Sequence, residues 1–300
     1  MLAIIRIGID PIAFHLGSLA VHWYGIMYAL AFIVAYQFGL VPYLEPRGIP
    51  RATIEKFAMW GIFFGLIGGR LYYVVQSGFL NYLEHPINII AVWQGGMAFY
   101  GAIFAALLTM AVLARRHRIS FWLLLDGGAM FGAIGQPIGR IGNFINGDIL
   151  GGPSTLPWAT AYTNPNAVLQ PGFSLCTPAH CVAYLPAEIF EAIGTLCILG
   201  ILLYMNRRKV RQGVIGITFI ALYSVSQLIV FTWRINMPTW FGLKQAQLTA
   251  IAVLLIAVPL LIYLWRRTEG RKPSGPDPAG SNTDLPHPES SAADALPASG

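Results

Sequence analysis

The sequence GRIGNFINGD, at residues 139–148, gathers side chains that bind anions. It holds the guanidinium group of Arg140, the carboxamides of Asn143 and Asn146 and the carboxylate of Asp148, spaced among three glycines. A guanidinium group donates two parallel hydrogen bonds to a phosphate, and glycine lets main-chain amides approach an anion closely. We therefore predict that this segment binds a phosphate group.

The elements that position this segment are predicted to be membrane helices. Of the 300 residues, 56% are hydrophobic and only 11% are charged, well below the roughly 25% charged residues of soluble domains. Seven apolar runs approach the length of about 20 residues that spans a bilayer. They cover residues 19–43, 57–76, 95–114, 120–138, 186–205, 213–233 and 245–265. The predicted fold is an all-α integral membrane protein with about seven transmembrane helices, and the anion available to it is a phospholipid headgroup.

Most of the 19 basic residues lie between these runs on alternate sides, which predicts the topology and argues against a nucleic-acid partner. By the positive-inside rule they place the N-terminus outside and the C-terminus in the cytoplasm. The 14 residues of this set are Arg47, Arg51, Lys56, Arg115, Arg116, Arg118, Arg207, Arg208, Lys209, Arg211, Arg266, Arg267, Arg271 and Lys272. We expect residues 1–267 to form one polytopic membrane domain and residues 268–300, rich in Pro, Ser and Gly, to form a disordered cytoplasmic tail.

Five basic residues fall outside this pattern. Arg6, Arg234 and Lys244 belong to short outer segments, where a solvated or headgroup-level charge is the ordinary interpretation. Arg70, in GGRLYY, and Arg140 lie within or at the outer end of apolar helices. An arginine at the centre of a bilayer costs at least about 2.5–3.5 kcal/mol, so such residues normally face a partner or a polar cavity. We predict functional roles for both.

Other polar and aromatic groups gather at the same predicted level. Glu188 and Glu191 are three residues apart and share a helix face, although an ordinary headgroup-level helix start would look the same. The segments WQGGMAFYG, which contains Tyr100, and HWYG, which contains His22 and Tyr24, are also compatible with an aromatic belt at the interface. Their common depth is what a membrane-embedded site requires.

The cysteines allow two interpretations. Cys176 and Cys181 lie in a long outer segment, where an oxidising compartment favours a small disulfide. A metal site that adds His180 is the alternative, and Cys197 is expected to be a core residue.

Taken together, these stretches resemble the prolipoprotein diacylglyceryl transferase family, from HWYG to LKQAQL. The most specific part is GRIGNFINGDILGG, in which Arg140, Asn143, Asn146 and Gly151 match the family signature, and GGRLYY, WQGGMAFYG, PAEIFEA and ALYS follow in the family's order. The resemblance implies a multi-pass protein of the bacterial inner membrane. It also implies transfer of the diacylglyceryl group of phosphatidylglycerol to the lipobox cysteine thiol of a preprolipoprotein signal peptide, with release of glycerol phosphate. It implies no metal and no cofactor.

The resemblance also assigns roles to residues. Arg140 would hold the phosphate, and Tyr100, where some relatives carry histidine, would act as a hydrogen-bonding or proton-relay residue; Tyr24 completes the predicted catalytic set. Because a free thiol has a pKa near 8.5, it must lose its proton before it attacks. The predicted substrate-binding residues are Arg70, Arg140, Asn143, Asn146, Asp148, Gly151, Glu191, Tyr223, Gln227 and Arg234.

Four positions depart from the family pattern. Asp148 stands where the signature usually has glutamate, and Glu188 replaces an amide. In the sixth helix, Gln227 and Phe231 stand where relatives commonly carry an arginine and a glutamate. Losing both charges together leaves neither one buried and unpaired, and Arg234, two turns further out, is the candidate for the missing charge.

Two other functions remain open from the sequence. The departures at Gln227 and Phe231 are compatible with a non-catalytic paralogue that binds phospholipid or signal peptides. The second alternative is an anion transporter. Such a protein would be expected to have broken helices in related halves and a site near the midplane, whereas the polar groups here gather at the outer level.

Overall fold

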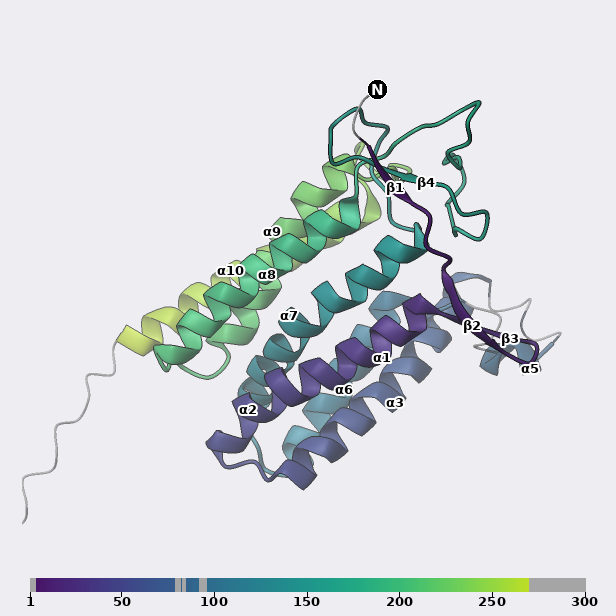
Figure 1. Cartoon of the computed structure of the whole chain (residues 1–300). Coiled ribbons are helices and arrows are strands. Elements are labelled where there is room, and N and C mark those ends of the chain that lie inside the picture. Colours follow the sequence, from purple (N-terminus) through teal and green to yellow (C-terminus); the bar gives the residue numbers. More distant parts are fainter. Residues whose placement is uncertain (1–3, 79–81, 83–84, 92–95, 270–300) are drawn as a thin grey trace, which may run out of the picture.

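The computed structural model of the chain describes residues 4–78, 82, 85–91 and 96–269, except the side chains of residues 99, 100 and 267–269. Of the predicted tail, residues 268 and 269 belong to the last helix, and residues 270–300 lie outside this part. The described chain is mostly helical (Figure 1). Its helices are α1 (Trp23–Ala35), η1 (Tyr36–Leu40), α2 (Val41–Leu44), η2 (Glu45–Arg47), α3 (Arg51–Gln76), α5 (Ile87–Ile90), α6 (Phe99–Arg116), α7 (Phe121–Asn146), α8 (Ala187–Arg207), α9 (Val214–Trp233) and α10 (Gln245–Glu269).

Each predicted apolar run corresponds to a long helical segment. Among the described residues, five such segments are long and apolar enough to cross a membrane. They are Trp23–Arg47, Arg51–Gln76, Ala187–Arg207, Val214–Trp233 and Gln245–Arg266. The expectation of an all-α, multi-pass membrane protein is therefore confirmed at this level.

Several boundaries differ from the sequence prediction, and two of them bear on the predicted site residues. Residues Leu19–His22 form the strand β3, which pairs antiparallel with β2 (Ile12–Leu16), so the first helix begins only at Trp23. In this hairpin the main-chain amide and carbonyl groups of Leu19–His22 pair with β2 instead of with a helix. The helix α7 continues to Asn146 rather than ending near residue 138, and Gly147, in the left-handed conformation (φ 81°), ends it. The signature segment is therefore largely helical.

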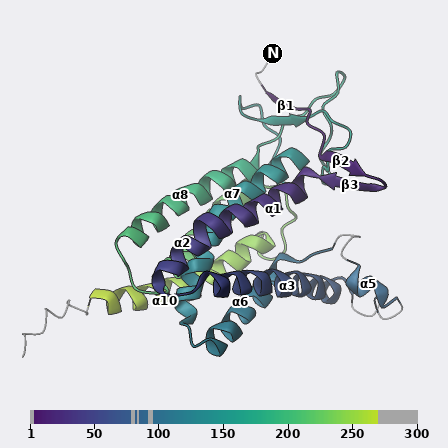
Figure 2. The same cartoon turned by 60° about the horizontal axis from the view of Figure 1, so that its bottom comes forward.

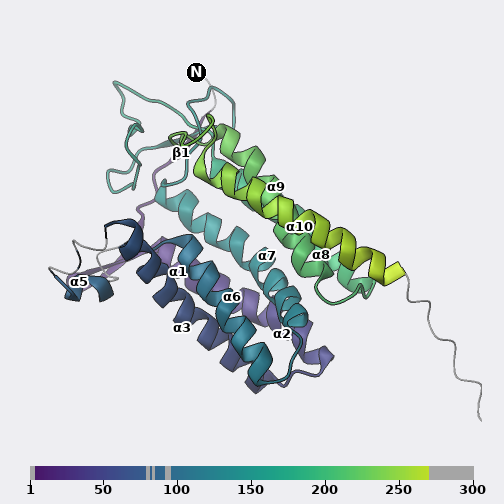
Figure 3. The same ribbon diagram turned by 180° about the vertical axis from the view of Figure 1, so that it is seen from behind.

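The helix α7 lies between two groups of helices (Figures 1 and 3). On one side it packs against α1, beside the pair α3 and α6, and on the other side it packs against α8 and α9, which are followed by α10. Glycines allow a close contact between α3 and α6. A Cβ atom at Gly68 of α3 would lie 2.6 Å from the carbonyl oxygen of Gly101 in α6. The central position of α7 explains why its polar residues meet side chains from several elements.

A cover of loops and short strands lies over the end of the bundle where α7 ends and α8 begins (Figures 1 and 2). In this cover β1 (Ile5–Ile7) pairs in parallel with β4 (Thr160–Tyr162). A small apolar core of Ile7, Leu150, Tyr162 and Tyr184 holds the cover together. At this end Asn143, in the last turn of α7, and Glu188, in the first turn of α8, are buried.

The cysteines occupy two different environments. Cys176 and Cys181 form a disulfide in the cover, so both thiols of the alternative metal site are already bonded to each other. Cys197, predicted to lie in the core, is instead exposed on the outer surface of α8. An exposed side chain does not belong to the core, so that prediction is wrong.

Candidate functional site

The last turns of α7 position a chain of polar groups. Arg140 and Asn143 are three residues apart and share a helix face. Nη1 of Arg140 donates to Oδ1 of Asn143 at 3.1 Å, and Nδ2 of Asn143 donates to both carboxylate oxygens of Asp148, at 3.1 and 3.2 Å. Because Gly147 turns the chain directly after the helix, Asp148 can reach back to Asn143. Burial raises the pKa of Asp148 above its usual value, and the hydrogen bond from Asn143 opposes that shift.

Glu191 of α8 joins two arginines from different helices. Its side chain is 0% exposed, and its Oε2 atom lies 2.5 Å from Nη2 of Arg140. Its Oε1 atom accepts from Nη1 of Arg234, the residue that follows α9, at 3.3 Å. Desolvation lowers the pKa of Arg234, and the carboxylate of Glu191 opposes this shift. Two guanidinium groups share one carboxylate, so the three side chains carry one excess positive charge.

Two tyrosines surround Arg140. The hydroxyl of Tyr223, on α9, is a hydrogen-bond partner of Arg140. Tyr24, on α1, stacks at a tilt on Tyr28 with ring centroids 4.6 Å apart, and its electrostatic surroundings include Arg140. A Cβ atom at Gly142 would lie 3.2 Å from Cα of Tyr24, so the glycine permits this close contact between α1 and α7.

The remaining signature residues support the cluster from the cover. The carbonyl group of Asn146 accepts a hydrogen bond from the amide of Val168, and its side chain hydrogen-bonds Asp148. The amide of Gly151 donates to Leu185 O at 2.7 Å. A Cβ atom at Gly151 would lie 3.0 Å from Trp233 O, beside Arg234. Only a glycine lets the loop approach the end of α9 this closely.

Arg70 lies in a different environment from this cluster. It is 5% exposed, and its guanidinium group donates to the carbonyl oxygens of Asn88, Ile89 and Gly96, at 2.5, 3.0 and 2.8 Å. These contacts hold main-chain groups of α5 and of Gly96, which lies three residues before α6. Tyr100 lies in the first turn of α6, but its side chain lies outside the part of the chain that the structure describes, so its catalytic role stays a prediction.

The two residues of α9 that differ from the family pattern, Gln227 and Phe231, have distinct surroundings. Nε2 of Gln227 is buried and has no hydrogen-bond partner among the described residues. Phe231 lies under Arg234, with the guanidinium carbon 4.5 Å from the ring centroid. The phenyl ring thus holds Arg234 by a cation–π contact. Lys244 also donates to the carbonyl oxygens of Phe231 and Arg234.

Glu188 and Tyr162 were not among the predicted site residues. The hydroxyl of Tyr162 donates to Phe144 O at 2.6 Å and lies 3.4 Å from Oε1 of Glu188. Glu188, like Glu191, is 0% exposed, so the alternative of a headgroup-level helix start is wrong for both. The cover buries the first turn of α8. The spacing of three within PAEIFEA was the signal in the sequence.

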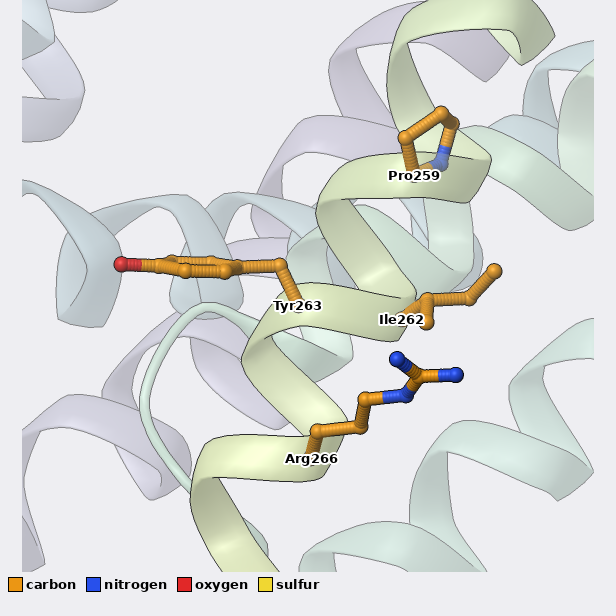
Figure 4. A pocket seen from close by; sticks show the side chains of 4 residues that line it. All are labelled: Pro259, Ile262, Tyr263 and Arg266. Atoms are coloured by element: carbon orange, nitrogen blue, oxygen red, sulfur yellow. The ribbon is translucent and has the colours of Figure 1, made fainter.

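A hollow on the surface of α10 is not part of this cluster (Figure 4). Its lining residues, Pro259, Ile262, Tyr263 and Arg266, all belong to that one helix. A site with walls from one helix cannot bring together groups from several elements, so we place the candidate site at Arg140.

The fold and this cluster define an all-α membrane protein with a buried cluster of two arginines and a shared glutamate beneath a cover of loops. The family model for prolipoprotein diacylglyceryl transferase matches residues 11–263. The chain therefore belongs to the prolipoprotein diacylglyceryl transferase family, as the sequence motifs predicted.

Individual relatives agree with the family match. The chain is 33% identical over 272 residues to the phosphatidylglycerol–prolipoprotein diacylglyceryl transferase of Geobacter sulfurreducens, covering 87% of this chain and 98% of the relative. It is 30% identical over 263 residues to the protein of the same name from Halalkalibacterium halodurans, covering 87% and 88% of the two chains. A third relative of that name, from Cupriavidus metallidurans, is 32% identical over 271 residues, which cover 87% of this chain and 95% of the relative.

Proposed function

We propose that this protein transfers the diacylglyceryl group of phosphatidylglycerol to the thiol of the lipobox cysteine in a preprolipoprotein. The sulfur forms a bond to the glyceryl carbon that carries the phosphate, and the carbon–oxygen bond to that phosphate breaks. Glycerol phosphate leaves with the electron pair, and the product is a thioether. Family membership supports the reaction.

The observation that carries the assignment of the site is the ionic cluster of Arg140, Glu191 and Arg234. Its excess positive charge suits a phosphate whose negative charge grows as the bond to carbon breaks, and donors already in position stabilise such charge most effectively. We assign the phosphate to Arg140, with Asn143 and Asp148 fixing the direction of its side chain. Arg234 supplies the second positive charge that relatives commonly draw from the position of Gln227.

The thiol proton must leave before or during the attack. We assign its relay to Tyr100 and place Tyr24 and Tyr223 against the reacting phosphate. Asn146 and Gly151 hold the cover over the site, and Arg70 fixes the segment that leads to Tyr100. These roles need neither a metal nor a cofactor.

We further propose that α6 and α7 also cross the membrane, which gives seven spans in the bacterial inner membrane. Both helices pack along spans, α6 against α3 and α7 against α1. The basic residues Arg47, Arg115 and Arg207 lie at the ends of η2, α6 and α8. The positive-inside rule then places the N-terminus outside and the C-terminus in the cytoplasm.

The test uses purified protein in phosphatidylglycerol vesicles with a synthetic lipobox peptide, and mass spectrometry of the peptide cysteine. We expect a diacylglyceryl mass gain that Arg140→Ala lowers by about 100- to 1,000-fold. Arg6→Ala is the matched control, because Arg6 is exposed in β1 at the same end of the bundle. No mass gain with the unaltered protein would contradict the proposal.

A second candidate function follows from Gln227 and Phe231. A non-catalytic paralogue would bind the lipid or the peptide without transfer. The double variant Gln227→Arg, Phe231→Glu separates the two functions: a transfer rate that appears only in this variant would mean that the natural chain is a binding protein. We expect the natural chain to be active already.

A further inference from the structure

The carboxyl group of Glu188 is buried without a positively charged partner. The residue is 0% exposed. Among the described residues no arginine, lysine or histidine forms an ion pair with it, because Arg140 and Arg234 both contact Glu191 instead. Its Oε2 atom has no hydrogen-bond partner in the same part of the chain. An ionised carboxylate buried in this way has a large desolvation cost, and such groups take up a proton instead.

The hydroxyl of Tyr162 indicates which form of Glu188 is present. This hydroxyl has one hydrogen, which it donates to Phe144 O at 2.6 Å, whereas Oε1 of Glu188 lies 3.4 Å away. A hydroxyl that donates to an ionised carboxylate makes a stronger bond of about 2.5–2.7 Å. Because the hydroxyl of Tyr162 donates to a neutral main-chain carbonyl instead, we infer that the carboxyl beside it is not ionised.

The charges around Glu188 favour the same form. Two carboxylates belong to its surroundings, Asp148 after the end of α7 and Glu191 on α8. The positive charge is that of Arg234, after the end of α9, which already pairs with Glu191. The main-chain amide of Glu188 itself, in the first turn of α8, is the other group that favours an anion. A third negative charge at this point therefore has no counterpart.

The charge of Glu188 matters for a site that binds a phosphate. Arg140 and Arg234 carry two positive charges, and Glu191 and Asp148 carry two negative charges. An ionised Glu188 would add an excess negative charge, which disfavours the binding of an anion. With Glu188 neutral these four charges balance, and the unpaired Nε atom of Arg140 can still donate to a phosphate.

We propose that Glu188 is a neutral carboxylic acid that positions the cover over the site. Its O–H group donates to a lone pair on the hydroxyl oxygen of Tyr162, whose own hydrogen bonds Phe144 in the last turn of α7. The acid thus links α8, β4 and α7 without adding a charge. A carboxylic acid offers a donor and an acceptor, as a carboxamide does, so Glu188 can stand where relatives carry an amide. Only the argument about the phosphate rests on the proposed function.

The first test reads the protonation state without turnover. Infrared difference spectra compare the unaltered protein with Glu188→Gln at neutral pH, in a detergent that contains no ester groups. We expect the unaltered protein to show the C=O stretching band of a protonated carboxyl, which the variant lacks. The control is Glu55→Gln, at an exposed position in α3, which should lose carboxylate stretching bands. Loss of carboxylate bands in Glu188→Gln as well would overturn the proposal.

The second test measures transfer from phosphatidylglycerol at neutral pH. We expect Glu188→Gln to keep kcat and the KM for this lipid within about twofold, because one neutral group replaces another. If Glu188 were ionised, the same variant would lose a negative charge near the phosphate and its KM would fall by about tenfold, which would overturn the proposal.

A third variant separates positioning from charge. Glu188→Leu removes the donor to Tyr162, so we expect kcat per folded molecule to fall by about three- to tenfold, while Glu188→Gln keeps it. Equal kcat values in the Leu and Gln variants would contradict the positioning role. Failure of the proposed function looks different, because no thioether would form with any of these proteins, and the infrared spectra would still report the protonation state.

Discussion

The two buried polar clusters of α7 differ in how completely their groups are paired. Near the start of the helix, Asp126 accepts from the hydroxyl of Tyr43 at 3.1 Å and from the amides of Gly213 and Gly216 at 2.8 and 2.7 Å. Both of its carboxylate oxygens are paired. Near the end of the helix, Nε of Arg140 has no partner among the described residues.

The difference separates a structural role from a binding role. Asp126 ties α2, α7 and the start of α9 together with partners that come only from the protein. The cluster around Arg140 keeps unpaired donors, which a ligand can satisfy. Incomplete pairing is therefore the better indicator of a site here than burial, since both clusters are buried.

The largest expected effect comes from Glu191→Gln, which leaves Arg140 and Arg234 without a shared carboxylate. Breaking a buried ion pair costs about 3–5 kcal/mol, and we expect the transfer rate to fall by at least about 100-fold with it. Vesicle assays give the rate, and thermal unfolding in detergent gives the stability. The control is Glu55→Gln, at an exposed position in α3. If the transfer rate and the stability of the variant are both near normal, Glu191 is not part of the site.

Asp126→Ala should destabilise the protein without disabling the site. Two main-chain amides lose their acceptor, which costs about 2–5 kcal/mol in the free energy of unfolding. The transfer rate per folded molecule should stay within about twofold, because Asp126 lies about 21 Å from Arg140 along the helix. A large loss of transfer rate in the folded variant would contradict the assignment of a purely structural role to Asp126.

Gly151→Ala should have an intermediate effect. The added methyl group would lie 2.9 Å from Cβ of Leu185 and 3.0 Å from Trp233 O, and such overpacking costs about 1–3 kcal/mol. Because Arg234 directly follows Trp233, we expect the transfer rate to fall by about tenfold. The matched control is Gly152→Ala, where a Cβ atom meets nothing within 4 Å. Equal rates in the two variants would contradict this explanation.

The smallest effect is expected from Phe231→Leu, which keeps an apolar side chain but removes the ring beneath Arg234. A cation–π contact contributes about 0.5–2 kcal/mol, so the transfer rate should fall by about three- to tenfold. The apparent KM for phosphatidylglycerol should rise if Arg234 helps to hold the phosphate. A rate equal to that of the unaltered protein would show that the ring does not support Arg234.

Much of the site follows from residue types and spacing. Arg140 and Asn143 are three residues apart on one helix, and Asp148 follows the glycine that ends it, so their contacts are local. The apolar runs likewise predicted the long helices, because about 20 apolar residues form a span whatever their neighbours. The start of the first helix was missed because Leu19–His22 continue the apolar run yet pair with β2.

Other parts of the site needed the folded chain. Glu191 and Arg234 are 43 residues apart, and no local rule shows that one carboxylate would join that arginine to Arg140. The burial of Glu188 depends on the cover, and the exposure of Cys197 depends on which face of α8 packs against its neighbours.

The sequence by itself determined the membrane class, the family, the long helices and the local Arg140–Asn143–Asp148 chain, because hydropathy, composition and short spacings act between near neighbours. Only the tertiary structure decided which charges pair, which polar atoms stay unpaired and which faces are buried. Those outcomes depend on how helices distant in the sequence pack together, and that packing brings Arg140, Glu191 and Arg234 to one point.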